Sequence, residues 1–63
     1  MPVLHMTVIK GRKKEEIEAM YSEVTDAIHR TLGAPKENVR IILNEVEPDH
    51  FAVAGKPKSG PSS

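Results

Sequence analysis

The spacing of apolar residues changes twice along this short chain, and that order limits the fold more than any other feature. Val3 to Ile9 alternates between two faces and is rich in β-branched residues, which favours a strand. From Lys14 to Leu32, apolar residues recur every three or four positions, which indicates the apolar stripe of a helix. Val39 to Val46 alternates again. The sequence therefore predicts a single α/β domain in the order strand, helix, strand.

The two ends of the predicted helix are not marked equally clearly. Gly33 favours a left-handed stop and Pro35 forbids continuation, so the helix should end just before them. Acidic residues follow Lys14, and the basic residues His29 and Arg30 lie in the last turn, as the helix dipole favours. No Ser, Thr, Asp or Asn immediately precedes the first turn as an N-cap. The end of the helix is thus better defined by the sequence than its start.

Length and cysteine content limit how such a domain can become stable. A chain of 63 residues buries too little surface to be more than marginally stable alone. It contains no cysteine, so neither a disulfide nor a thiolate metal site can add stability. The two strands should be parallel, with a right-handed crossover, and one helix covers only one face of their sheet. Because the other face also carries apolar residues and the sheet edges are free, we expect self-assembly.

A short C-terminal region follows the second predicted strand. Glu47 to Asp49 is expected to turn the chain, and Phe51 to Ala54 to form a small hairpin or arm. From Lys56 to Ser63 the chain consists of Lys, Gly, Pro and Ser, a composition typical of a flexible tail. We place the domain at residues 1–56 and the tail at residues 57–63.

Composition argues against several classes of function. The formal net charge is zero, and no basic stripe accompanies the two aromatic residues, so nucleic-acid binding is not indicated. No apolar run reaches membrane-spanning length, and there is no secretory signal pattern. His5, His29 and His50 show no metal-ligand spacing, and we interpret each as a surface or hydrogen-bonded histidine. We expect a soluble, cytoplasmic protein without membrane or nucleic-acid partners.

Pro2 directly follows the initiator methionine and is the first candidate for chemistry. Methionine is normally removed before a small residue such as proline, which would leave a free secondary amine. Chain-terminal amines have an ordinary pKa of about 7.7–8.0, and nearby cations or an apolar pocket push the pKa lower. A neutral amine at physiological pH is a competent general base. Met-Pro also occurs by accident, so Pro2 needs support from the rest of the sequence.

Three further residues could accompany such a base. Arg12 follows Gly11 at the end of the first predicted strand, and Arg40 lies early in the second. Each arginine could bind a carboxylate through its planar fork of donors, and both would disfavour protonation of a nearby amine. Phe51 could form an apolar wall that keeps water from the amine. Taken singly, the arginines are better explained as a solvated loop charge at Arg12 and an open-face strand residue at Arg40, and Phe51 can also be read as a core residue.

Together these features resemble the 4-oxalocrotonate tautomerase family. The resemblance rests on Pro2, the Gly11-Arg12 pair, Arg40 in the second strand, and the segment His50-Phe51-Ala52-Val53-Ala54-Gly55. It extends from Pro2 to about Lys56. The specificity lies in the combination of an N-terminal proline, the chain length, the βαβ order and both arginines.

The resemblance implies a fold, an assembly and a mechanism. Family members are βαβ subunits that pair into dimers with a four-stranded sheet covered by helices, and three dimers usually form a hexamer. Carried onto this chain, Pro2 is the general base after loss of Met1 and moves a proton between oxygen and carbon of a dienol such as 2-hydroxymuconate. Arg12 would bind a substrate carboxylate, and Arg40 of a neighbouring subunit the other carboxylate or the 2-oxo oxygen. Phe51 would line the pocket, and neither a metal nor an organic cofactor is expected.

Differences from related enzymes leave the substrate open. Dehalogenase relatives carry an arginine and a water-activating glutamate where this chain has Ile9 and Val53, so hydration of a haloacrylate is disfavoured. Lys10 and Lys13 add positive charge near Arg12, which could help to recruit anionic substrates. Two alternatives remain: a tautomerase for another enol acid such as phenylpyruvate enol, or a small non-catalytic oligomeric module.

Overall fold

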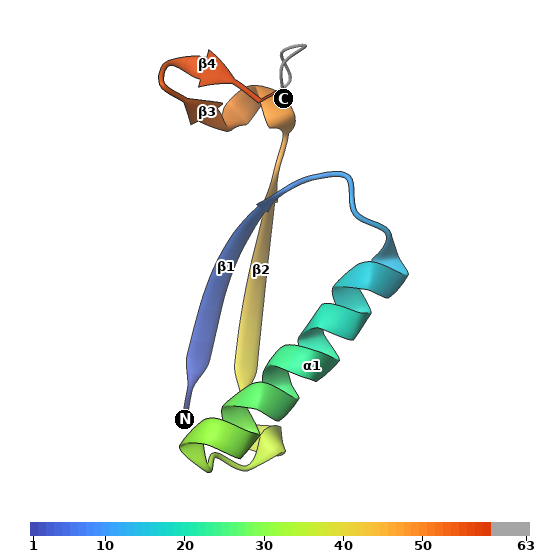
Figure 1. The fold of residues 1–63 in the computed structure, drawn as a ribbon, viewed down its shortest axis with the longest axis vertical. Helices are drawn as coiled ribbons and strands as arrows, with labels where there is room; N and C mark the ends of the chain where they lie inside the picture. The colour runs from blue at the N-terminus through green and yellow to red at the C-terminus, as the bar shows by residue number, and fades with distance from the viewer. Residues whose placement is uncertain (59–63) are drawn as a thin grey trace.

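The computed structural model describes residues 1–58 as a parallel two-stranded sheet, a long helix beside it and a C-terminal hairpin (Figure 1). The α/β order of strand, helix and strand followed by a hairpin is the one that the sequence predicts. In chain order the elements are β1 (Val3–Ile9), α1 (Lys14–Leu32), the 3₁₀ turn η1 (Lys36–Asn38), β2 (Arg40–Val46), the 3₁₀ turn η2 (Pro48–His50), β3 (Ala52–Val53) and β4 (Lys56–Pro57).

β1 and β2 form one continuous parallel ladder. Its register runs from Val3 opposite Arg40 to Ile9 opposite Val46. One further bond extends it, because the backbone N–H of Lys10 donates to the carbonyl of Val46 over 2.8 Å. Parallel pairing places the amino ends of both strands at one end of the sheet and their carboxyl ends at the other.

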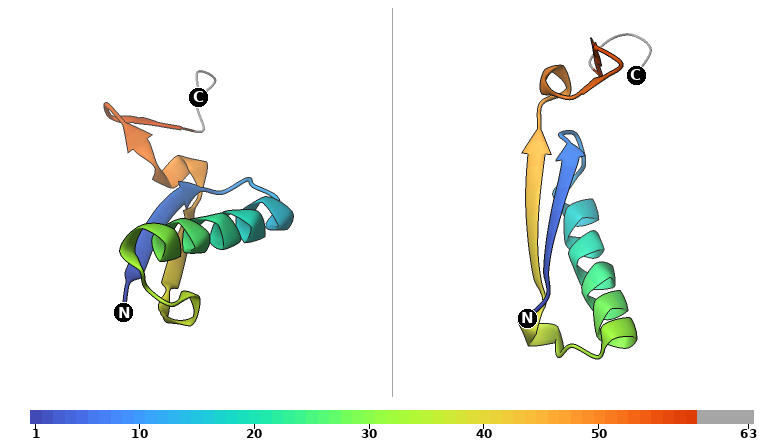
Figure 2. Two further views of the ribbon diagram at one scale, coloured as in Figure 1. Left: turned by 60° about the horizontal axis from the view of Figure 1, so that its bottom comes forward. Right: turned by 90° about the vertical axis from the view of Figure 1, so that its left-hand side faces the viewer.

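The two faces of this sheet differ in what covers them (Figure 2). α1 lies against one face, where Leu4, Met6 and Leu43 are half-buried. The opposite face carries Val3 and Ile42, whose exposed fractions are 48% and 50%. No residue within 1–58 is fully buried. One copy of the chain therefore has a partly shielded apolar layer but no closed core.

Backbone N–H groups just outside the two ends of α1 form hydrogen bonds that set the bounds of the helix. At its start, the Glu16 carboxylate accepts a bond from the backbone N–H of Lys13 over 2.9 Å, as a glutamate at the third helical position does in a capping box. At its end, Gly33 has a φ of 76° and its N–H donates to the His29 carbonyl over 3.0 Å. The predicted helix, Lys14–Leu32, is confirmed, and Glu16 supplies the missing start signal.

β2 begins one residue later than the pattern predicts. Val39 closes η1, because its N–H donates to the Lys36 carbonyl over 3.1 Å. The same turn is tied to the helix by an ion pair of 2.8 Å between the Lys36 ammonium and the Asp26 carboxylate. The apolar side chain of Val39 continues the alternation of β2, although its backbone belongs to the turn before it.

The C-terminal segment forms the expected hairpin, and its second strand takes in part of the expected tail. β3 pairs antiparallel with β4, with Ala52 opposite Pro57. Ala54 and Gly55 between them both have positive φ, 54° and 80°, the combination typical of a type I′ turn. Lys56 and Pro57 thus lie in a strand, where the sequence analysis expects tail. Residues 59–63 of that predicted tail lie outside the described residues.

Candidate functional site

Pro2 and Arg40 lie together at the amino end of the sheet. The backbone N–H of Arg40 donates to the Pro2 carbonyl over 3.0 Å, and Pro2 is half-buried. The Arg40 guanidinium is exposed, and its Nη1 donates to the carbonyl of Glu37 over 2.6 Å. Met1 precedes Pro2, so the Pro2 nitrogen is a peptide nitrogen here, and Met1 is 77% exposed. Removal of this accessible residue would turn that nitrogen into an amine next to the backbone of Arg40.

Arg12 and Phe51 lie at the opposite end, beyond the carboxyl ends of β1 and β2 (Figure 1). Arg12 belongs to the loop between β1 and α1, and its Nη1 donates to the carbonyl of Ile9 over 3.1 Å. Phe51 follows η2 and is half-buried. Its N–H donates to the Pro48 carbonyl over 3.3 Å, and its own carbonyl accepts from the N–H of Lys58 over 2.8 Å. Local turns therefore hold both residues near the carboxyl end of the sheet.

The length of β1 separates these two groups of candidates. A strand rises about 3.3 Å per residue, so a strand as long as β1 covers about 20 Å. Within one chain, the backbone of Arg40 thus lies next to Pro2, while Arg12 and Phe51 are held away from them. The grouping differs from the one that the resemblance implies, in which Arg40 comes from a neighbouring subunit. A site that contains all four residues requires more than one copy of the chain.

The positive charge of the lysines near Arg12, at the carboxyl end of the sheet, is partly compensated by an ion pair. The Lys10 ammonium forms an ion pair of 3.1 Å with the carboxylate of Glu47, which joins the ends of β1 and β2. Lys13 is exposed at the start of α1, next to Arg12. Since Lys10 already has an anionic partner, Arg12 and Lys13 are the better candidates for attracting an anion to this end.

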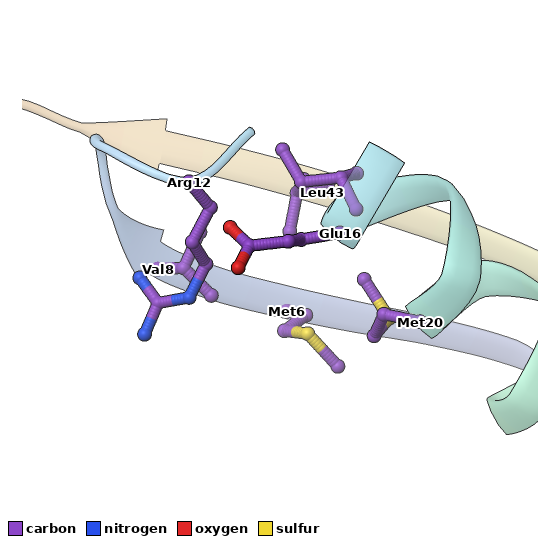
Figure 3. A pocket seen from close by; sticks show the side chains of 7 residues that line it. Met6, Val8, Arg12, Glu16, Met20 and Leu43 are labelled. Atoms are coloured by element: carbon purple, nitrogen blue, oxygen red, sulfur yellow. The ribbon is translucent and has the colours of Figure 1, made fainter. Parts of the chain in front are cut away.

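A cavity of about 290 Å³ opens beside Arg12, between the first turns of α1 and the sheet (Figure 3). Arg12 and Glu16 line the end next to the loop, and Figure 3 shows the Glu16 carboxylate directed toward the Arg12 side chain. No single sequence pattern reveals this cavity, although the apolar stripe of the helix and the alternation of the strands contain its wall residues. The apolar walls are Met6, Val8, Ile17, Met20 and Leu43.

One carboxyl group with a shifted pKa lies away from the candidate residues, where α1 is linked to η1. The hydrogen bond from Lys36 and its positive charge hold the pKa of the Asp26 carboxyl below its ordinary value of 3.8. Arg30 and His29 contribute in the same direction. This carboxylate faces the solvent, so we interpret its ion pair as part of the connection between the helix and the turn.

Within residues 1–58, no helix is both long and apolar enough to cross a membrane. The His, Asp and Glu side chains of these residues do not form a group of three or more that could hold a metal ion.

The sequence matches a known protein family over almost its whole length. The family described as "Tautomerase enzyme" matches residues 2–60. A probable tautomerase of Ralstonia nicotianae is 48% identical over 59 residues, which cover 94% of this chain and 84% of the relative. A probable tautomerase of Staphylococcus aureus is 37% identical over 59 residues, covering 94% of this chain and 97% of the relative.

Solved structures of similar chains have the same fold. TomN, a 4-oxalocrotonate tautomerase homologue of the tomaymycin biosynthetic pathway, superimposes with a TM-score of 0.90 at 36% identity, covering 92% of this chain and 89% of TomN. A heterohexamer 4-oxalocrotonate tautomerase from Chloroflexus aurantiacus gives a TM-score of 0.92 at 28% identity, covering 97% and 98%. With its βαβ order, its hairpin and the match over residues 2–60, the chain belongs to the tautomerase family.

Proposed function

We propose that the mature protein is a cofactor-independent keto–enol tautomerase that acts on a small unsaturated 2-oxo acid of the 2-hydroxymuconate type. The observation that carries the proposal is the position of Pro2, half-buried at the amino end of β1 and hydrogen-bonded through its carbonyl to the backbone of Arg40. Removal of the exposed Met1 would free a secondary amine at the amino end of the sheet, where Arg40 begins β2. Membership of the tautomerase family supports this assignment.

The proposed reaction needs only a proton carrier and fixed positive charge. The neutral Pro2 amine would take the proton of the enol hydroxyl and return it to a carbon of the conjugated system, which gives the 2-oxo isomer. Negative charge develops on the enolate oxygen during the transfer. Arginine side chains already in position would stabilise that charge and hold the substrate carboxylates. The same positive charge disfavours protonation of the amine before substrate binds.

Assembly would bring the separated residues into one site. If two copies pair antiparallel along β1, the amino end of one sheet lies beside the carboxyl end of the other. Arg12 and Phe51 of one copy then approach Pro2 of its partner. This pairing at the edge leaves the open face uncovered. Contact of that face with further copies would bury the exposed halves of Val3 and Ile42, and burial of apolar surface contributes about 25 cal/mol per Å². The hexameric Chloroflexus relative supports an assembled state, and we propose a hexamer built as a trimer of dimers.

A kinetic experiment tests the proposal. Protein whose intact mass shows loss of Met1 is mixed with 2-hydroxymuconate, and the decay of the dienol absorbance is followed. We expect decay well above the buffer rate. Protein that retains Met1, in which the Pro2 nitrogen is an amide, should be slower by about 10²–10⁴-fold, the range for loss of a general base. Equal rates for the two proteins, with unchanged circular dichroism, would show that Pro2 is not the base.

The same purified protein also distinguishes the proposed function from two alternatives. A substrate panel that includes phenylpyruvate enol identifies a tautomerase for a different enol acid. A non-catalytic assembly module would keep Met1 in the purified protein and turn over none of the enols. The presence of exposed arginines at both ends of the sheet, without an ion pair to either among residues 1–58, favours an anion-binding enzyme over such a module.

A further inference from the structure

We propose that Asp26 and Lys36 are positioning residues that hold the guanidinium of Arg40 in place through the turn η1. Neither side chain would touch the substrate. Their ion pair would hold η1 against α1, and a backbone carbonyl of η1 would hold the guanidinium. The inference rests on the proposed function, because it takes Arg40 to bind a carboxylate or the 2-oxo oxygen of the substrate.

The Arg40 guanidinium is held by a carbonyl that the backbone of η1 leaves to it. A continued 3₁₀ turn would join the Arg40 N–H to the Glu37 carbonyl, three residues earlier. This N–H instead donates to the Pro2 carbonyl over 3.0 Å, as part of the sheet. The Glu37 carbonyl accepts from Nη1 of Arg40 over 2.6 Å. That bond orients the guanidinium plane, and the remaining donors stay available for an anion.

Two side chains of α1 hold the segment that contains this carbonyl. The Asp26 carboxylate forms an ion pair of 2.8 Å with the Lys36 ammonium. One turn later on the helix, Nδ1 of His29 donates to the Ala34 carbonyl over 2.8 Å. Because Glu37 directly follows Lys36 in the chain, loosening of the ion pair would let the Glu37 carbonyl move. A path of direct contacts thus leads from the helix to the guanidinium.

The exposure of the ion pair limits the size of its effect. The side chains of Lys36 and Asp26 are 57% and 52% exposed, and ion pairs at such positions contribute little to overall stability. The lowered pKa of the Asp26 carboxyl agrees with a carboxylate that is paired in the folded state. Loss of the pair should therefore loosen η1 without unfolding the chain. A displaced binding group still slows a reaction that depends on fixed positive charge.

A double-mutant cycle tests whether Asp26 acts through Arg40. In protein without Met1, Asp26→Asn should lower kcat/KM for 2-hydroxymuconate about two- to fivefold, the range for an exposed ion pair. Asp26→Glu keeps the charge and should restore most of the loss. In an Arg40→Ala background, Asp26→Asn should cause no further loss. As a matched control, Glu23→Gln removes an exposed acidic side chain from the preceding turn of α1 and should leave kcat/KM unchanged.

NMR signals of the arginine side chains test the geometry without turnover. A guanidinium held through Nη1 rotates slowly about its Nε–Cζ bond, so its two Nη groups give separate signals at low temperature. We expect separate signals for Arg40 in the wild type and in Glu23→Gln, and merged signals in Asp26→Asn. The signals of Arg12, whose hydrogen bond lies at the other end of the sheet, should not change. Single substitutions to lysine assign the signals of the three arginines, Arg12, Arg30 and Arg40.

The outcomes separate this inference from the proposed function. Unchanged Arg40 signals in Asp26→Asn would overturn the inference, and so would an equal loss of kcat/KM with and without Arg40. A loss of the same size in Glu23→Gln would also overturn it, because the effect would then come from the charge of the helix in general. Absence of turnover for every enol would instead overturn the proposed function, while the Nη signals would still decide whether the ion pair holds Arg40.

Discussion

Arg40 and Pro2 are joined by a backbone hydrogen bond of 3.0 Å, from the N–H of Arg40 to the carbonyl of Pro2. This bond continues the parallel ladder by one step beyond β1 and holds the first residue of the proposed mature chain at the edge of the sheet. The nitrogen of Pro2 is thereby kept close to the start of β2. A free chain end would otherwise move among many conformations, so the bond also lowers the entropic cost of positioning the proposed base.

Separation of Pro2 from Arg12 along β1 predicts complementation between subunits. Protein that retains Met1 and Arg12→Ala protein without Met1 should each be nearly inactive toward 2-hydroxymuconate. Mixing them under mild denaturant, followed by refolding, should restore part of the activity, because mixed assemblies contain sites with an intact Pro2 and an intact Arg12. The measurement is the rate of dienol decay before and after mixing. If the mixture stays as inactive as its components, the two residues do not meet across subunits.

The helix start predicts a difference between two substitutions of Glu16. Glu16→Ala removes the acceptor for the Lys13 N–H and should lower the free energy of unfolding by about 1 kcal/mol, a typical cost for loss of a cap. Glu16→Gln keeps the acceptor and should cost much less. Urea denaturation at one fixed protein concentration measures both values. Equal destabilisation by the two variants would show that charge, rather than the hydrogen bond, is what stabilises the first turn.

The left-handed backbone at Gly33 predicts a conformational cost for any side chain there. Its φ is 76°, and an added Cβ would meet no atom within 4 Å, so the cost of Gly33→Ala arises from the backbone and not from a clash. We expect about 1–2 kcal/mol of destabilisation. Gly33→Asn should cost less, because asparagine tolerates this conformation better. Thermal denaturation of the two variants beside the wild type makes the comparison.

The Asp26–Lys36 ion pair predicts a small dependence of stability on acid pH. Lys36 lowers the pKa of the Asp26 carboxyl from its ordinary value of 3.8, so the folded state favours the carboxylate. The resulting stabilisation is present above about pH 4 and is lost as the pH falls through the lowered pKa of the folded state. Asp26→Asn should therefore be slightly less stable than wild type near pH 7 and equally stable at the acid end. Because the pair is exposed, raising the salt concentration should shrink the difference at neutral pH.

The elements themselves could be predicted because each depends on residues close in sequence. The alternation in Val3–Ile9, the apolar stripe of Lys14–Leu32 and the Gly33 stop are local signals, and the structure places these elements accordingly. The differences are also local: Val39 belongs to the η1 turn, and Lys56 and Pro57 pair in β4. In both places the backbone bonds of a short turn outweigh what composition suggests.

The candidate residues could be named from the sequence, but the sequence could not predict which of them lie together in the structure. Residue types and order identify Pro2, Arg12, Arg40 and Phe51 as candidates, and their roles stay predictions. The cavity with Glu16 at its end depends on how α1 lies over the sheet. No pattern within a single element reports that contact, because it joins side chains from β1, α1 and β2.

The sequence by itself determined the α/β order of strand, helix and strand and the place of Pro2 directly after Met1, because both follow from local spacing and from neighbouring residues. The tertiary structure alone decided that Pro2 lies beside Arg40 while Arg12 and Phe51 lie at the far end of the sheet. That arrangement depends on the register of β1 against β2, in which residues almost forty positions apart in sequence become neighbours through backbone hydrogen bonds.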